Sequence, residues 1–405
     1  MKRLFIILIF SIVSYAGFSQ ETNVYTFFLN VVNDNFKFPL IGFVNMSKGN
    51  HKGIQLGFVN WNVRNFSGLQ MGFVNTLGAD LTGAQLAYIN TAIQQVHGMQ
   101  VGFINTSIQE VTGVQFGFIN TALKTTNGAQ FGFVNTAKQS IRGLQASFLN
   151  TAWQEASGAQ IGFFNTAFKS VDGVQIGFVN TALKPVDGAQ IGFVNTALQS
   201  LNRAQLGFVN TTVKESRGPQ LGFVNIANRK VNGVQLGFIN FADTIENGVP
   251  IGFLSFVKRG GYYAFEVGFS EFFPVTVGFK TGVEKFYTTI YLAYQPAEAS
   301  GKNIYASGIG VGSIIPLRKS FFFNPELHTF NTIERKINRQ LTSFVPYFGY
   351  HFNPHFSITA GTSAIWSRSY EDDIYLKPSF YIKNFDIDKN NAIFVGARAS
   401  IRYRF

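Results

Sequence analysis

The feature that most constrains this chain is a fifteen-residue period. Asn recurs at every fifteenth residue from Asn45 to Asn240, and each Asn closes a segment such as residues 173–180. An aromatic residue stands two places before each of these Asn residues, and Gln stands five places before them from Gln55 onward. A strict period without insertions is typical of one structural unit stacked on copies of itself. Such an array offers an extended surface and lacks the irregular loops that usually carry enzyme pockets.

Alternation within one unit predicts which side chains share a face of a strand. Successive side chains point to opposite faces, so one face would hold Val174, Ile176, Phe178 and Asn180, and the other Gln175, Gly177 and Val179. The first face is strongly apolar, and we expect it to be the buried one. The connector that follows ends in Asp187-Gly188, a pair typical of turns because Gly accepts positive φ.

Two architectures fit this unit. In a parallel β-solenoid each unit is one coil, and identical residues of successive coils stack about 4.8 Å apart. In an antiparallel meander, which could close into one large barrel with the C-terminal region, each unit is one strand. Antiparallel turns alternate between two ends and usually diverge, with one set short and the other long in membrane barrels. The connectors here share one length and similar sequences, which favours the solenoid.

In a solenoid the repeated Asn side chains would form a hydrogen-bonded ladder, because each amide can donate to the carbonyl of the next. We therefore interpret them as structural residues. They are Asn45, Asn60, Asn75, Asn90, Asn105, Asn120, Asn135, Asn150, Asn165, Asn180, Asn195, Asn210, Asn225 and Asn240. The Gln series from Gln55 to Gln235 is also interpreted as structural. The alternative is an exposed binding face flanked by Trp61 and Trp153 in the turns.

The repeat also carries a resemblance. The unit G-x-Q-x-G-[FY]-x-N, as in residues 53–60 and 98–105, resembles that of exported bacterial surface-repeat proteins, over about residues 37–257. The resemblance implies a surface or envelope location and supplies no catalytic residues. Pro250 stands where Gln is expected and Ser255 where Asn is expected, so we expect the array to end there.

The N-terminus predicts export. Lys2 and Arg3 precede an apolar run at residues 4–13, and small residues stand before a plausible cleavage site at residue 19. We assign residues 1–19 to a signal peptide and 20–36 to an N-terminal strand or cap. The chain has no Cys, which excludes disulfides and thiolate metal sites. Its net charge of +12 is scattered over turns, so we expect no nucleic-acid partner, while anionic surface polysaccharide or a protein ligand is a possible one.

Residues 258–405 predict a second region of alternating strands, punctuated by Pro and Asn-Pro. In the last run Val395, Ala397, Ala399, Ile401, Tyr403 and Phe405 share one face, and Gly396, Arg398, Ser400, Arg402 and Arg404 share the other. An apolar, aromatic-edged face opposite a polar one suits a wall between lipid and a lumen. This run resembles the terminal strand of bacterial outer-membrane β-barrels, which implies that Tyr403 and Phe405 signal to the barrel-insertion machinery. The alternative is a soluble barrel whose last strand has one solvent-exposed face. Eight to ten strands would give a filled interior.

We find no candidate catalytic, cofactor-binding or metal-binding residues. His351 and His355 flank Asn353-Pro354, which favours a turn over a helical metal site. The Gly308–Gly312 run alternates as a strand should, with no helix after it, so it does not indicate a phosphate loop.

The sequence thus predicts an all-β protein, with a β-solenoid at residues 37–257 followed by an antiparallel β-barrel-like region at 258–405. The alternative is one large antiparallel barrel that includes the repeats. We expect a non-enzymatic protein of the outer membrane or cell surface with a structural, adhesive or ligand-contact role. A channel or transporter is the alternative function.

Overall fold

A computed structural model describes the chain except residues 1–22, 298–302, 334–338, 370–375 and 377. The predicted signal peptide therefore lies outside the described residues. The chain divides into two units, Met1–Phe178 and Val179–Phe405. The first holds coils of a β-solenoid, and the second holds further coils and a β-barrel.

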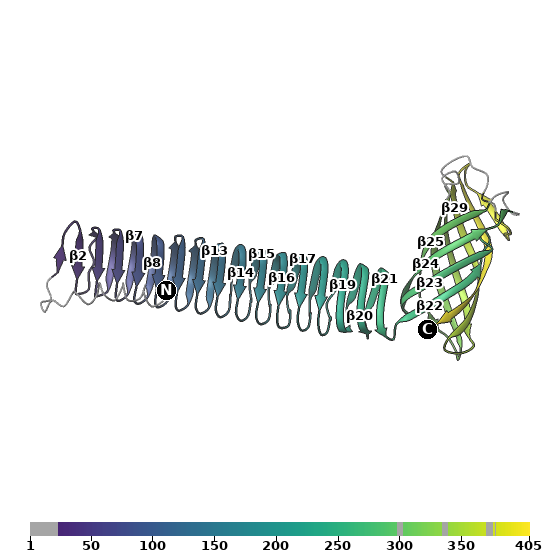
Figure 1. Ribbon diagram of the computed structural model, residues 1–405, viewed down its shortest axis with the longest axis horizontal. Helices are drawn as coiled ribbons and strands as arrows, with labels where there is room; N and C mark the ends of the chain where they lie inside the picture. The colour runs from purple at the N-terminus through teal and green to yellow at the C-terminus, as the bar shows by residue number, and fades with distance from the viewer. Residues whose placement is uncertain (1–22, 298–302, 334–338, 370–375, 377) are drawn as a thin grey trace. The chain divides into compact units, whose positions relative to one another are not determined.

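The coils consist of short strands connected by tight turns (Figure 1). The strands are β1 (Val24–Tyr25), β2 (Leu29–Val32), β3 (Leu40–Ile41), β4 (Val44–Ser47), β5 (His51–Leu56), β6 (Val59–Asn62), β7 (Phe66–Leu77), β8 (Leu81–Ala92), β9 (Val96–Val101), β10 (Ile104–Ser107), β11 (Val111–Phe116), β12 (Ile119–Ala122), β13 (Thr126–Ala137), β14 (Leu144–Ala152), β15 (Ala159–Ala167), β16 (Val174–Ala182), β17 (Ala189–Ala197), β18 (Ala204–Thr212), β19 (Gln220–Val231), β20 (Val234–Ile245) and β21 (Val249–Arg259).

Equivalent strands of successive coils pair in parallel with a register of fifteen residues. Between β7 and β8, for example, Gln70 lies opposite Gln85 and Asn75 lies opposite Asn90. The predicted parallel solenoid is confirmed. The alternative of one large antiparallel barrel is wrong, because an antiparallel meander would not align identical residues of adjacent repeats along their whole length.

The predicted burial of the apolar face is wrong, and the cause is a corner within each repeat. Strand β5 ends at Leu56 and β6 begins at Val59, so Gly57 and Phe58 lie at a bend. A bend of this kind resets the alternation of side chains, as an extra residue does in a β-bulge. Gln55 and Asn60, five residues apart, therefore both point inward and are fully buried, while the Phe58 side chain remains 46% exposed.

The Gly at this corner lies where two backbones approach closely, and Ala87 and Ser147 take its place in two of the coils. A Cβ atom added to Gly57 would lie 2.2 Å from the carbonyl oxygen of Gly42 in the preceding coil. The aromatic side chain beside the corner turns outward, where its ring stacks on that of the next coil. The interior is lined by apolar columns, mostly of Ala, Val and Leu, which include Leu81, Ala92 and Val111.

The buried amides form two ladders that run in opposite directions. Asn45 Nδ2 donates to Asn60 Oδ1 of the following coil (2.8 Å) and to the Leu56 carbonyl (2.9 Å). Gln85 Nε2 donates instead to Gln70 Oε1 of the preceding coil (2.8 Å). Each inward amide thereby finds partners without water, which satisfies the requirement of a buried polar group. Because the ladders point in opposite directions, their side-chain dipoles offset each other along the stack.

The ladders begin and end where the sequence changes. Asn30 Nδ2 donates to Asn45 Oδ1 (2.8 Å), so the ladder begins one coil before the period read from the sequence. Phe28 stands two places before Asn30, which was the available signal. At the other end Asn240 donates to the Ser255 hydroxyl (3.3 Å). Gln235 Oε1 is buried without a partner, because Pro250 replaces the Gln that would donate to it.

The barrel belongs to the second unit and is antiparallel (Figure 1). Eight strands close it through the pairing of β22 with β31, where Phe265 lies opposite Tyr403. The short β26 pairs with β27, and the short β30 pairs with β31. Its strands are β22 (Tyr262–Phe269), β23 (Val275–Val283), β24 (Phe286–Gln295), β25 (Ile304–Gly312), β26 (Ile315–Pro316), β27 (Phe321–Thr332), β28 (Arg339–His351), β29 (Phe356–Ser369), β30 (Lys383–Asp386) and β31 (Asn391–Arg404).

The last coil of the second unit is capped by residues of the barrel. The Thr281 hydroxyl donates to the Ser255 carbonyl (2.6 Å), and the Tyr263 hydroxyl donates to the Val257 carbonyl (2.9 Å). These bonds satisfy backbone groups of β21 that would otherwise form an open sheet edge, a site where chains aggregate.

Breaking one rung of the Asn ladder should destabilise the coils around it. Asn105 Nδ2 donates to Asn120 Oδ1 and to the Phe116 carbonyl, both at 2.8 Å. We expect Asn105→Ala to cost about 1–3 kcal/mol for each buried group left unpaired, seen as faster amide hydrogen exchange in residues 90–120. Thr106→Ala, one residue away and half-buried, is the matched control and should leave exchange unchanged. Equal exchange rates in the two variants would contradict the claim that the Asn ladder stabilises the coils.

Candidate functional site: the charged interior of the barrel

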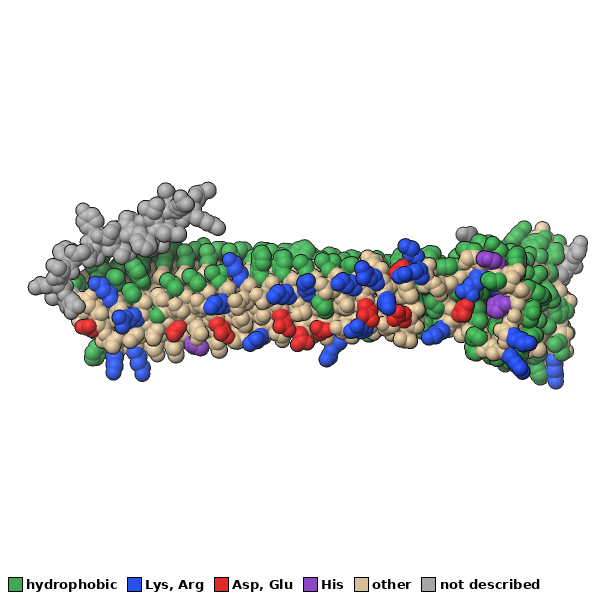
Figure 2. Space-filling view, turned by 90° about the horizontal axis from the view of Figure 1, so that it is seen from below, with side chains coloured by type: hydrophobic (Ala, Val, Ile, Leu, Met, Phe, Trp, Pro, Cys, Tyr) green, Lys and Arg blue, Asp and Glu red, His purple; other side chains and the backbone are tan. Residues whose placement is uncertain are grey.

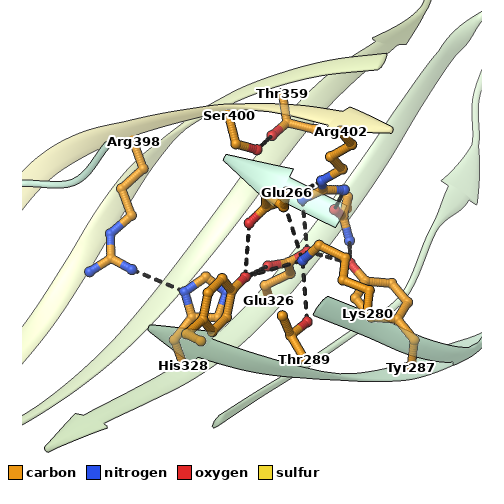
Figure 3. A network of polar contacts seen from close by, with 12 residues as sticks. Glu266, Lys280, Tyr287, Thr289, Glu326, His328, Thr359, Arg398, Ser400 and Arg402 are labelled. Atoms are coloured by element: carbon orange, nitrogen blue, oxygen red, sulfur yellow. Dashed lines mark hydrogen bonds and ion pairs between the residues drawn. The ribbon is translucent and has the colours of Figure 1, made fainter. Parts of the chain in front are cut away.

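The barrel wall separates apolar from polar side chains residue by residue. In β31 Ile401 is 59% exposed on the outside, whereas Arg402 is 1% exposed on the inside. In β22 Phe265 and Val267 point outward, and Glu266 between them is buried inside. The predicted faces of the last strand are thus observed. The interior, however, is packed with side chains that join into one polar network (Figure 3).

Glu326 of β27 lies at the centre of this network. Its carboxylate accepts hydrogen bonds from Lys280 Nζ (2.8 Å), Arg402 Nη2 (2.8 Å) and the Tyr291 hydroxyl (3.1 Å). The Tyr287 hydroxyl also donates to it. Charge-assisted bonds of this kind are about twice as strong as neutral ones, so Glu326 ties strands β23, β24, β27 and β31 together.

Glu266 is the second acceptor of the same cations. It pairs with Arg402 and with Lys280, whose Nζ lies 3.3 Å from Glu266 Oε2. Its Oε1 lies 3.0 Å from the Tyr291 hydroxyl, whose single proton is shared between Glu266 and Glu326. Lys280 also donates to the Thr289 hydroxyl (3.2 Å). Two carboxylates and two cations thus share one buried site.

His328 connects this cluster to a second ion pair. Arg398 Nε donates to Glu271 Oε2 (3.1 Å), and Arg398 Nη1 lies 3.0 Å from His328 Nδ1. A guanidinium can only donate, so His328 Nδ1 accepts and the ring proton resides on Nε2. That atom lies 2.6 Å from Glu326 Oε2, to which it donates. The geometry therefore assigns a neutral His328.

The formal charges of the interior cancel. Among the described residues the buried barrel interior holds the acids Glu266, Glu271 and Glu326 and the bases Lys280, Arg398 and Arg402. The cavity beside Glu266, Tyr291 and Arg398 has a volume of about 10 Å³, which holds one water molecule at most. Among the described residues the interior is therefore a plug of paired charges, and this cavity has no space for a substrate.

A second cavity, of about 620 Å³, lies at one rim of the barrel. Glu284, His351, His355 and Arg404 contribute to its lining. His355 Nδ1 lies 2.8 Å from the Arg404 carbonyl oxygen, and Glu284 pairs with Arg404 at half-exposed positions. Among the residues that the structure describes, no group of three or more His, Asp or Glu side chains is placed to hold a metal ion.

Aromatic rings gather at the same rim. Tyr403 and Phe405, which the resemblance implies to be an insertion signal, are 44% and 56% exposed. Their rings contact Phe356 (5.1 Å between centroids for Tyr403) and Phe265 (5.6 Å for Phe405). An outward aromatic cluster at a barrel rim is typical of the level at which lipid meets water.

The sequence analysis did not predict the charged network inside the barrel. Lys280, Glu326 and His328 are scattered over separate strands, and their convergence follows only from closure of the barrel. The available signal was a charged residue between two apolar ones, such as Glu266 between Phe265 and Val267, which recurs at Arg402.

Comparisons with known proteins do not indicate a function for this chain, so any functional argument starts from the residues described above. No protein-family model, curated protein or solved structure matches this chain. In the described part of the chain, no helix combines the length and apolar character needed to cross a membrane.

Removing the central carboxylate should destabilise the barrel. Glu326→Gln leaves Lys280 and Arg402 short of a counter-charge, and breaking a buried pair in this way costs about 3–5 kcal/mol. We expect this loss in the free energy of unfolding of the full chain, followed by urea titration. Glu284→Gln is the control, because its partly exposed pair with Arg404 should contribute at most about 1 kcal/mol. A loss below 1 kcal/mol for Glu326→Gln would contradict the central role of this residue.

Proposed function

We propose that this chain is a non-enzymatic protein of the outer membrane or cell surface. Its barrel is an anchor embedded in lipid, and its coils present a regular surface with a structural, adhesive or ligand-contact role. The carrying observation is the inverted wall of the barrel: apolar side chains such as Leu292 (63% exposed) and Ile309 (52%) point outward, and the paired charges lie inside. In water such a wall would expose a large apolar surface.

The paired charges support an anchor over the alternative of a channel or transporter. Conduction needs a continuous polar path, and the cavity among these charges measures only about 10 Å³. Eight strands leave an interior just wide enough for side chains to fill, as the paired charges do here. The predicted export signal agrees with delivery to the envelope. Surface polysaccharide or a protein ligand remains the proposed partner of the coils, and lipid that of the barrel.

A charge placed on the outer wall distinguishes a membrane barrel from a soluble one. Leu292 is exposed, so Leu292→Arg should change stability by no more than about 0.5 kcal/mol if this surface faces water. If the surface faces lipid, the substitution should cost about 2–4 kcal/mol near the bilayer centre. We expect the larger value for the full chain refolded in lipid vesicles, measured by urea titration.

The matched control is Ile387→Arg, at an exposed position of similar size in the turn between β30 and β31. It should fold as the unsubstituted chain does. The membrane location would be overturned if neither Leu292→Arg nor Ile387→Arg changed the stability. It would also be overturned by a full chain that stays soluble and monomeric without detergent.

We also propose that Tyr403 and Phe405 are read by the barrel-insertion machinery. Replacing both with Ser should lower the fraction of chains that reach a folded barrel in cells several-fold. The folded fraction is measured by mobility on gels before and after boiling. Phe348→Ser, another exposed aromatic of the outer wall (62%), is the control. An equal loss of folded chains for Phe348→Ser would contradict a specific role of Tyr403 and Phe405 in insertion.

A further inference from the structure

The coils of the first unit carry an apolar face that nothing in the described chain covers. We define its aromatic column as the ring residue at the corner of each coil. Its members are Phe43, Phe58, Phe73, Tyr88, Phe103, Phe118, Phe133, Phe148, Phe163 and Phe178. The apolar face is this column together with the outward residues two places earlier, among them Met71, Phe116 and Ile161. Hydrophobic side chains form a continuous band over the coils, and charged ones lie apart from it (Figure 2).

The area of this face is that of a stable interface. The side chains of the column are 40–52% exposed. With about 200 Å² for each aromatic side chain, the column alone exposes roughly 900 Å². The largest apolar patch of a typical monomer is about 300–600 Å². One side of a standard protein–protein interface buries about 800 Å².

The geometry of the rings excludes a stacking ligand. Neighbouring rings of the column stack with centroids 4.8–5.2 Å apart and planes within 15° of parallel. Each ring face is therefore covered by the next ring, and only ring edges point outward. A sugar or a nucleobase stacks on the face of an aromatic ring. Because the ring faces of this column are already covered, neither ligand can stack on it.

The charges beside the face do not suit a membrane surface. A protein face that lies on lipid is normally rimmed by Lys and Arg. Here the connectors carry both signs, as in Glu110, Lys124, Lys138 and Glu155, and the eight-residue segments that end at Asn45 to Asn165 contain no charge. Mixed signs instead allow two identical surfaces to meet without repulsion between their rims.

We propose that the apolar face is the contact surface for a second copy of this chain. Two such faces carry ridges of the same spacing, one per coil, and can interdigitate as the inner faces of a β-sandwich do. The contact is isologous, so the same patch of both copies is buried. This inference goes beyond the proposed anchor function, because it concerns the coils and does not depend on what surrounds the barrel.

Single Cys residues test the pairing cleanly, since the chain has none. Met71→Cys and Ile161→Cys place a thiol on the apolar face at positions that are 42% and 43% exposed. Gln94→Cys places one on an exposed connector as the matched control. The full chain is reconstituted in lipid vesicles at low protein density and treated with a short bismaleimide.

We expect covalent dimers from the face positions, either from each variant alone or from a mixture of the two, in at least about tenfold excess over Gln94→Cys. Like-with-like products indicate parallel copies, and products that join residue 71 to residue 161 in a mixture of the two variants indicate antiparallel copies; both support the pairing. Adding Phe118→Glu to the chains that cross-link buries an unpaired charge in the contact and should abolish most of the dimer, whereas adding Gln94→Glu should not.

Two results would overturn the pairing. One is cross-linking at Met71, both alone and in a mixture with Ile161→Cys, that is no greater than at Gln94. The other is a fluorophore at Met71 that is quenched by brominated lipid chains while the protein remains a single chain, which would assign the face to lipid. Gel mobility of the same samples before and after boiling reports the barrel separately, so failure of the membrane anchor and failure of the pairing are distinguishable.

Discussion

The coils depend on one interaction, the hydrogen bond from a buried side-chain amide to the same side chain of the adjacent coil. A coil of fifteen residues is too small to enclose a large apolar core, and its interior columns are mostly small residues such as Ala92 and Val111. The Asn and Gln ladders make up the rest of the interior. They also fix the register, because a slip by one residue would leave every amide unpaired at once.

The same interaction explains the unusual outer surface. With Gln and Asn pointing inward on both sides of a tight corner, the aromatic residue between them has no place inside and stacks outside on its own kind. A structural requirement of the interior thus creates a long apolar face. The barrel inverts polarity too, but for another reason: its small closed cross-section is filled by paired charges around Glu326, and its apolar residues point outward.

Much of this fold could be predicted from the sequence, and the failures have identifiable causes. The period and uniform connectors predicted parallel coils, and the alternation in residues 395–405 predicted the two faces of the last strand. Burial of Phe178 was predicted wrongly, because strict alternation assumes an unbroken strand and the corner at Gly177 resets it. Asn30 was missed because Phe27 stands where the next units have a Gly, as at Gly42. The network of Glu266, Lys280 and Glu326 could not be predicted, since its members converge only when strands distant in sequence close the barrel.

The central claim, that stacked amides hold the coils, is tested most directly by hydrogen exchange of the side-chain NH₂ groups in a full chain labelled with ¹⁵N at Asn. The buried Asn45–Asn240 series should exchange orders of magnitude more slowly than an exposed connector amide. Exchange of the series at the rate of a connector residue such as Asn202, whose own side-chain bond is exposed, would contradict the ladder and the fold built on it.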